Sequence, residues 1–245
     1  MARRDVNHFQ QSMATYKAPR NISRRQELRE DAVTTVWVRI QELYYDYRRL
    51  IHGIGIGVAV LLLGYFGYDY LQGIRADQAE ELLGGIILVY EDEEYQAALD
   101  GTATAPGFVE IIEDYGSTPS GNLARFYAAD AAFRLGDFDR AFDYFRSFEG
   151  DDDLIAASAL AGQAAVYEIR EEYVRGGDLF RRAAAVVDSD LNAPGYLMAA
   201  GRAYEKAGDF DEALDAYEMI RERYPESTQA QDIEFVLARA RAGMR

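Results

Sequence analysis

The sequence predicts an all-α protein in which an N-terminal transmembrane helix is followed by a solenoid of repeated helical hairpins and a C-terminal capping helix. Three observations lead to this prediction. Residues 50–68 are apolar and carry no charged side chain, the residues after them are strongly acidic, and similar strings recur in the acidic part with spacings of 35 and 37 residues. Together they indicate one membrane span and one repetitive helical domain.

Composition narrows the possible functions. The 245-residue chain contains no cysteine, which excludes disulfides, thiolate metal sites and cysteine nucleophiles. Its net charge of −16 argues against nucleic-acid binding, because a polyphosphate is bound by clustered Lys and Arg. Residues 1–49 hold 10 basic and 6 acidic residues, whereas residues 69–245 hold 16 basic and 36 acidic residues. This contrast predicts that the two parts lie in different environments.

The N-terminal part is predicted to contain a tail and a helix. Residues 1–22 are polar and patternless, so we expect a disordered cytoplasmic tail. Ser23 and Gln26 form a capping box that begins a helix. Apolar residues then recur at three- and four-residue steps, at Val33, Trp37, Ile40, Tyr44 and Tyr47. Residues 23–49 are therefore predicted to form an amphipathic juxtamembrane helix that lies on the bilayer or against a partner.

Residues 50–70 are predicted to be the transmembrane helix. The uncharged stretch within them is 19 residues long, which gives about 28 Å of helix against about 30 Å of hydrocarbon. Arg48 and Arg49 precede it directly, whereas Arg75 alone follows it closely. The excess of arginine on the N-terminal side predicts a cytoplasmic N-terminus. The alternative is a buried core helix, although few soluble cores need a helix that is apolar on every face.

Two glycines in the span suggest a membrane partner. Gly53 and Gly57 form a G-x-x-x-G pair, and small residues at this spacing allow a neighbouring transmembrane helix to approach closely. The alternative interpretation is that they are ordinary glycines, which are common in membrane spans.

The acidic part, residues 71–245, repeats itself. The strings LGDFDRAFDYF at 135–145 and AGDFDEALDAY at 207–217 nearly coincide, and REEYVRGGDLF at 170–180 has the same layout. We expect small residues where the two helices of a hairpin cross and aromatic residues between neighbouring hairpins. These positions are Gly201, Ala213 and Tyr217 in the last unit, Ala164, Gly176 and Phe180 before it, and Ala129, Ala141 and Phe145 before that.

This register predicts the organisation of the whole domain. The units lie at about 78–116, 122–155, 157–190 and 194–226, and residues 227–242 form the capping helix. The string TATAPG at 102–107 interrupts the first unit. Pro225 lies near the end of the last unit, where it ends the second helix.

The spacing and residue types of the units resemble tetratricopeptide repeats. With a tail, one span and four such hairpins in this order, the chain resembles the bacterial single-span inner-membrane proteins of the ancillary Sec translocon subunit family. The resemblance implies an inner-membrane protein with a cytoplasmic N-terminus and a periplasmic repeat domain. It also implies protein partners, namely the translocon, periplasmic chaperones and client polypeptides emerging from the channel.

No catalytic, cofactor-binding or metal-binding residues are predicted. The two histidines, His8 and His52, precede the acidic domain, so a Ser-His-Asp constellation cannot form there. The acidic clusters at 91–94 and 151–153 fall where turns are expected. They lack the alternating ligands and glycine of a calcium-binding loop, so solvated turns explain them better.

Function is therefore expected on the concave face, which the first helix of each unit lines. Projecting the register places the candidate groove residues there: Phe126, Asp130, Phe133, Arg134, Glu168, Met198, Arg202, Glu205 and Lys206. Aromatic and methionine anchors beside a few charges suit an extended or helical peptide. Alternatively, Phe126 and Phe133 pack against adjacent helices.

Three functions are compatible with this reading. The first is a membrane-anchored adaptor or chaperone for exported proteins near the Sec translocon. The second is an accessory or scaffold subunit of another inner-membrane complex, of the respiratory or assembly type. The third is an enzyme, which the repeat register makes the weakest of the three because it accounts for most of the domain without catalytic groups.

Overall fold

The computed structural model describes residues 24–244, except for the side chains of residues 24–37, 39–42 and 51. This described part is helical and contains no β-strand, as predicted for an all-α chain. The chain divides into two compact units, residues 1–66 and 67–245. The predicted tail at residues 1–22 lies outside the described residues.

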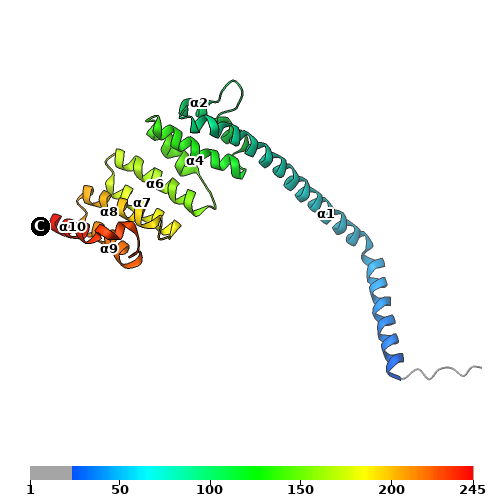
Figure 1. Cartoon of the computed structure of the whole chain (residues 1–245). Helices are drawn as coiled ribbons and strands as arrows, with labels where there is room; N and C mark the ends of the chain where they lie inside the picture. The colour runs from blue at the N-terminus through cyan, green and yellow to red at the C-terminus, as the bar shows by residue number, and fades with distance from the viewer. Residues whose placement is uncertain (1–23, 245) are drawn as a thin grey trace, which may run out of the picture. The chain divides into compact units, whose positions relative to one another are not determined.

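The first helix, α1, runs without interruption from Arg24 to Glu91 (Figure 1). The prediction was three consecutive helical segments: the juxtamembrane helix, the span and the start of the first repeat. One helix contains all three because no proline occurs between its ends, so nothing removes a backbone hydrogen bond along its length.

The middle of α1 is apolar and unburied. Among the described residues, α1 is the one helix long and apolar enough to cross a membrane, judged by length and composition. The stretch concerned is His52–Glu91, its most apolar window has a mean hydropathy of 1.6, and none of that window is buried. Leu61 and Leu63 are each 74% exposed. Apart from the adjoining backbone of α1, a Cβ atom added at Gly53 or Gly57 would meet no described atom within 4 Å.

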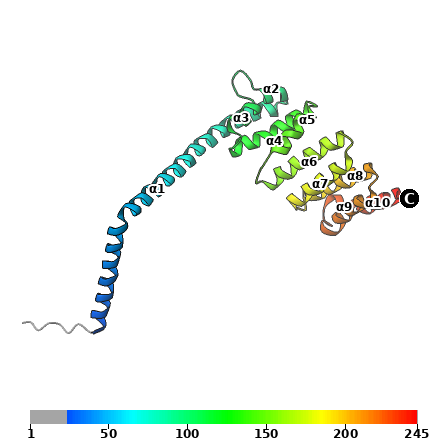
Figure 2. The same cartoon turned by 180° about the vertical axis from the view of Figure 1, so that it is seen from behind.

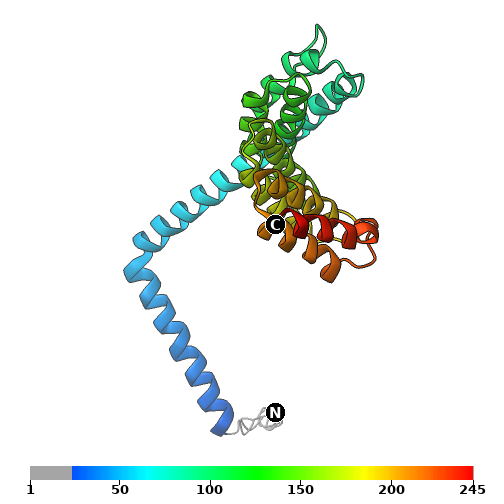
Figure 3. The ribbon, with the colours of Figure 1, turned by 90° about the vertical axis from the view of Figure 1, so that its left-hand side faces the viewer.

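Residues 67–245 form successive helical hairpins. The end of α1 pairs with α2 (Tyr95–Asp100) and α3 (Phe108–Tyr115), and the next pairs are α4 (Pro119–Arg134) with α5 (Phe138–Ser147), α6 (Asp153–Ile169) with α7 (Tyr173–Val187), and α8 (Ala193–Ala207) with α9 (Phe210–Arg223). A short 3₁₀ helix, η1 (Thr228–Asp232), and α10 (Ile233–Gly243) follow. Figures 2 and 3 show the hairpins of this unit stacked in chain order from green to red.

The four hairpins turn through the same backbone conformation at the same place in the repeat. Glu93, Gly136, Glu171 and Gly208 have φ values of 63°, 81°, 61° and 78°. Glycine adopts this left-handed conformation without a steric cost. In the two turns that have glycine, the next residue is an aspartate that accepts a backbone N–H bond at the start of the second helix. In the recurring G-D-F string, the glycine therefore forms the turn, the aspartate caps the second helix, and the phenylalanine is the first residue of that helix.

A loop interrupts the second helix of the first hairpin. It joins α2 to α3 through residues 101–107, where TATAPG departs from the repeat pattern. Gly101 has a φ of 93°, and the backbone N–H of Thr102 donates to the carbonyl oxygen of Ala105 over 2.8 Å. A proline and this tight turn prevent a continuous helix here.

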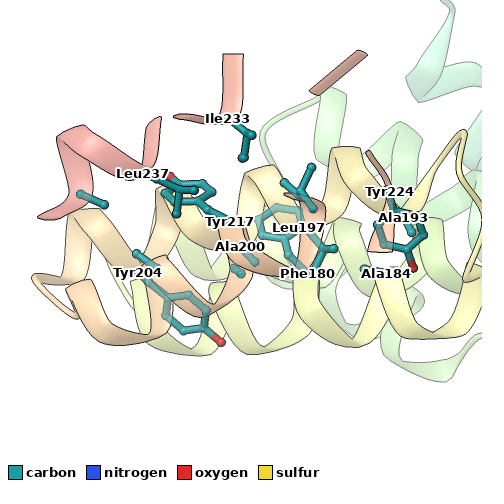
Figure 4. Close-up of a cluster of buried hydrophobic side chains, with 14 of the residues drawn as sticks. Phe180, Ala184, Ala193, Leu197, Ala200, Tyr204, Tyr217, Tyr224, Ile233 and Leu237 are labelled. Carbon is teal, nitrogen blue, oxygen red and sulfur yellow. The ribbon is translucent and has the colours of Figure 1, made fainter. Parts of the chain in front are cut away.

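The core of the repeat domain consists of two clusters. The first extends from Leu83 to Ala159, and the second from Ala164 to Ala240. Figure 4 shows that the second cluster combines residues of α7, α8, α9 and α10, so the C-terminal helix closes the array. The seam between the clusters falls within α6, whose Ala159 and Ala164 belong to different clusters.

Small residues allow the close helix crossings that the register predicted. A Cβ atom added at Gly201 on α8 would lie 2.2 Å from the ring of Tyr217 on α9. Tyr217 is completely buried, and so are Ala129, Ala164 and Ala213 at the other predicted crossing positions. Close-packed crossings of this kind leave no room for a larger side chain.

Candidate functional site

The first helices of the repeats lie next to one another and form one continuous surface. We call this surface the first-helix face; it consists of the end of α1 with α4, α6, α8 and α10. Side chains that are 34–40 residues apart join consecutive helices across it. The joined pairs are Tyr90 with Asp130, Glu168 with Lys206, and Glu205 with Arg239.

The N-terminal part of this face contains a polar group around Asp130. Its carboxylate accepts hydrogen bonds from the Tyr90 hydroxyl and, over 2.5 Å, from Nε of Arg134. Arg134 also donates to the Tyr95 hydroxyl over 3.1 Å, and its guanidinium lies 5.3 Å from the centre of the Tyr95 ring. Burial and the bond to Asp130 raise the pKa of Tyr90, so its hydroxyl stays protonated and continues to donate.

The C-terminal part contains two ion pairs. Nζ of Lys206 lies 2.9 Å from Glu168 and 5.4 Å from the centre of the Tyr173 ring. Arg239 lies 2.7 Å from Glu205, whose side chain is 17% exposed. Hydrogen bonding to Glu205 raises the pKa of Arg239 above its already high value. Most of the charges predicted to meet a ligand are therefore paired with a neighbouring helix.

The three apolar candidates of this face are half-buried. Phe126 packs against Phe145 and Phe148, with ring centres 5.9 Å apart in both cases. Phe133 makes an edge contact with Phe138 at 5.3 Å. Met198 packs against the C-terminal core cluster. Contacts within the domain therefore hold both phenylalanine rings, which is the packing role that the sequence left open for them.

A less polar strip separates these groups in the middle of the face. The positions that carry Met198, Arg202 and Lys206 on α8 correspond to Ala161, Ala165 and Ile169 on α6. Ile169 is 46% exposed. Arg202 is also exposed, and it forms no ion pair or side-chain hydrogen bond with any residue in the described part of the chain. A shallow apolar strip beside one open guanidinium can accept a protein segment.

Several partners on this face were not among the predicted site residues. Tyr90 lies at the end of α1, and Arg239 lies in the helix predicted only as a cap. Projecting the register back from Phe133 does lead to Tyr90, but sequence spacing does not tell which side chains pair across helices. Arg239 has no equivalent in the hairpins, so no signal in the repeat pattern points to it.

The described residues do not suggest a chemical centre. No group of three or more His, Asp or Glu side chains among residues 38–244 is placed to hold a metal ion. The acidic clusters lie in turns, and Asp152 caps α6 by accepting the N–H bonds of Leu154 and Ile155 over 2.9 and 3.0 Å. The titration shifts belong to tyrosines and arginines in structural contacts between helices.

Comparison with known proteins identifies the repeats. The tetratricopeptide repeat family matches residues 123–150 and 196–227, which correspond to the α4–α5 and α8–α9 hairpins. Among solved structures, the chain is similar to nearly identical TPR-like repeats of a Podosopora anserina protein described as a kinesin light chain. The TM-score is 0.50 at 14% identity, and the match covers 69% of this chain and 87% of that one. No curated protein matches the sequence.

The α4–α5 and α8–α9 hairpins are therefore tetratricopeptide repeats. The α6–α7 hairpin lies between the two matched segments and has the same turn geometry, although Glu171 replaces the turn glycine. Tetratricopeptide repeats are protein-interaction scaffolds and are typically non-enzymatic. The repeats therefore indicate protein partners in general.

Proposed function

We propose that the protein is a membrane-anchored tetratricopeptide scaffold that binds segments of other proteins on its first-helix face. The observation that carries this proposal is the combination, in one chain, of interaction repeats with a long helix whose most apolar stretch is not buried by any residue that the structure describes. The repeats supply the binding surface, and the helix supplies the attachment.

The apolar part of α1 supports the membrane attachment. From Leu50 to Leu71 its large apolar side chains are 48–74% exposed wherever they are described. Contiguous apolar surface of this extent is costly in water, because each fully exposed aliphatic side chain forgoes about 1.5–3 kcal/mol of burial. A bilayer removes this cost. The arginines before the span favour a cytoplasmic N-terminus and an extracytoplasmic repeat domain.

The first-helix face suits an extended or helical segment of a partner. Its α6 strip offers apolar contact through Ala161, Ala165 and Ile169, and Arg202 offers an open guanidinium at the edge. The charges on either side of the strip are already paired within the domain, which leaves Arg202 as the charged candidate available to a ligand.

The partners that we propose are exported polypeptides and the Sec translocon of a bacterial inner membrane. The support is the order of tail, anchor and repeats, which resembles the ancillary translocon subunits. In this role the protein is an adaptor or chaperone that meets polypeptides and periplasmic chaperones near the channel exit.

Site-specific photocrosslinking tests this proposal. A photoreactive amino acid in place of Arg202 is expected to crosslink to secretory clients or translocon subunits in living bacteria. The same amino acid at Asp215, which is exposed on α9 away from the strip, is the matched control. Identical crosslinks from both positions, or none to exported proteins, would contradict the proposal.

A second candidate function is an accessory subunit of another inner-membrane complex. The observation that favours it is the uncovered surface at Gly53 and Gly57, where an added Cβ would meet no described atom within 4 Å other than the adjoining backbone of α1. It predicts that one complex co-purifies stoichiometrically in mild detergent. The variant Gly53→Leu/Gly57→Leu should lose that complex, whereas Gly55→Leu on the opposite side of the helix should retain it.

A further inference from the structure

A hollow of about 610 Å³ lies on the other side of the repeats, between α5 and α7 and above α6. We call it the outer hollow. Its floor is made by Leu160, Gln163 and Tyr167 of α6. These residues lie about half a helical turn away from Ala161, Ala165 and Ile169, since residues 3.6 apart share a face. The outer hollow is therefore distinct from the first-helix face.

The walls of the outer hollow combine arginines with apolar and aromatic side chains. Three arginines lie around it: Arg146 from α5, with Arg175 and Arg182 from α7. Phe142, Phe148 and Leu179 supply apolar wall. Such a convergence of basic groups stands out in residues 69–245, which hold 16 basic and 36 acidic residues.

The next repeat shows what is missing from this site. The spacings of 35 and 37 residues make Arg146 and Arg175 equivalent to Arg181 and Glu212. Arg181 and Glu212 form an ion pair of 2.5 Å that joins α7 to α9. In the outer hollow, Arg175 stands at the position of the glutamate. Arg146 and Arg175 therefore carry like charges and cannot form the ion pair that joins the two helices in the next repeat.

The existing ion pairs leave this positive charge largely unsatisfied. Arg146 and Arg182 form no ion pair with any residue in the described part of the chain, and Arg175 pairs with Glu172 of its own helix turn. Asp178, the single carboxylate around the hollow, accepts the Tyr204 hydroxyl over 2.8 Å on the α8 side. An external anion is therefore the natural counterpart of these guanidiniums.

We propose that the outer hollow is a second docking site, which binds an acidic segment of a partner protein that carries an aromatic or aliphatic anchor. Carboxylates of the segment pair with Arg146, Arg175 and Arg182, and the anchor packs on the apolar wall. A volume of about 300–1,000 Å³ is typical of sites that enclose a few such groups. A nucleic acid fits less well, because three arginines in a strongly acidic domain neither attract nor neutralise a long polyphosphate.

The full-length chain in detergent micelles tests this proposal by fluorescence anisotropy. The probe is a short labelled peptide of glutamate and leucine with one phenylalanine, and its control has lysine in place of every glutamate. The acidic peptide should bind saturably, more weakly as salt is raised, and the lysine peptide should not bind. The variant Arg146→Gln/Arg182→Gln should weaken binding at least about tenfold, while Arg202→Gln on the first-helix face should leave it within about twofold.

Arg175→Glu separates binding from folding. It recreates the arginine–glutamate pair of the next repeat, so it should abolish peptide binding without lowering the melting temperature. The proposal is overturned if neither variant of the hollow changes binding, if Arg202→Gln removes it equally, or if the acidic peptide fails to bind. Tighter binding of a single-stranded oligonucleotide than of the peptide would also overturn it. These outcomes are independent of the crosslinks expected from position 202, so this site and the first-helix face can fail separately.

Discussion

Replacing Gly201 by alanine tests the helix crossing that most strongly defines the repeat packing. Gly201 lies inside α8, where an added Cβ would come within 2.2–2.8 Å of three ring atoms of Tyr217. Tyr217 is completely buried in the C-terminal core cluster, so its ring cannot swing into solvent. The methyl group must therefore push α8 and α9 apart.

The expected change in the free energy of unfolding on Gly201→Ala is the balance of two opposing effects. Glycine to alanine in a helix interior stabilises by about 1 kcal/mol, whereas forcing one methyl group into a close-packed core costs about 1–3 kcal/mol and sometimes more. With fixed atoms this close, we expect the cost to prevail. The free energy of unfolding should fall by about 1–2 kcal/mol, and the melting temperature by roughly 2–8 °C for a domain of this size.

Urea titration of the full-length chain in detergent, followed by circular dichroism, measures this change. Gly195→Ala in the same helix is the matched control, because the nearest atom to its added Cβ is Nε2 of Gln229 at 3.8 Å. The control should raise the free energy of unfolding by up to about 1 kcal/mol. The reasoning is refuted if Gly201→Ala is as stable as Gly195→Ala.

Three further predictions concern turns, titration and surface charge. Glu171→Gly should raise the free energy of unfolding by roughly 1 kcal/mol, because Glu171 has a φ of 61° in a turn where two other hairpins have glycine. Thermal unfolding measures this change, and an unchanged or lower free energy of unfolding contradicts the prediction. Burial raises the pKa of Tyr217 from 10.0 to about 12, so the stabilisation that comes from keeping this hydroxyl neutral is present below pH 10 and is lost between pH 10 and 12. Tyr217→Phe should therefore reduce the loss of unfolding free energy at alkaline pH by about 2–3 kcal/mol. An unaltered pH profile of the unfolding free energy contradicts this prediction. Lys206→Ala should change stability by less than about 1 kcal/mol, because the Lys206 side chain is 55% exposed in its pair with Glu168; a larger loss in the same urea assay would show that the pair is structural.

Local sequence signals predicted the repeats well. The strings at 135–145, 170–180 and 207–217 gave the register that aligns three equivalent turns, in which Gly136, Glu171 and Gly208 have positive φ. Small residues such as Ala129 and Gly201 were recognisable at the crossings, because close helix approach limits side-chain size wherever it occurs. These features are encoded within a few residues of each other.

Features that depend on contacts between distant helices were not predicted. The charges assigned to a ligand, such as Asp130 and Glu205, turned out to pair with Tyr90 and Arg239 on neighbouring helices. The outer hollow becomes visible only when the arginines of α5 and α7 are placed around α6.

Cysteine accessibility tests the membrane-anchored scaffold most directly, because the natural chain contains no cysteine. Two single-cysteine variants are expressed in bacteria: Ser12→Cys before the span, and Ser117→Cys at an exposed position of the repeat domain. The account predicts that both proteins remain in the membrane after alkaline carbonate extraction. It also predicts that a membrane-impermeant maleimide applied to spheroplasts labels only the cysteine at position 117. Release of the protein by carbonate, or labelling at position 12 instead, would contradict the account.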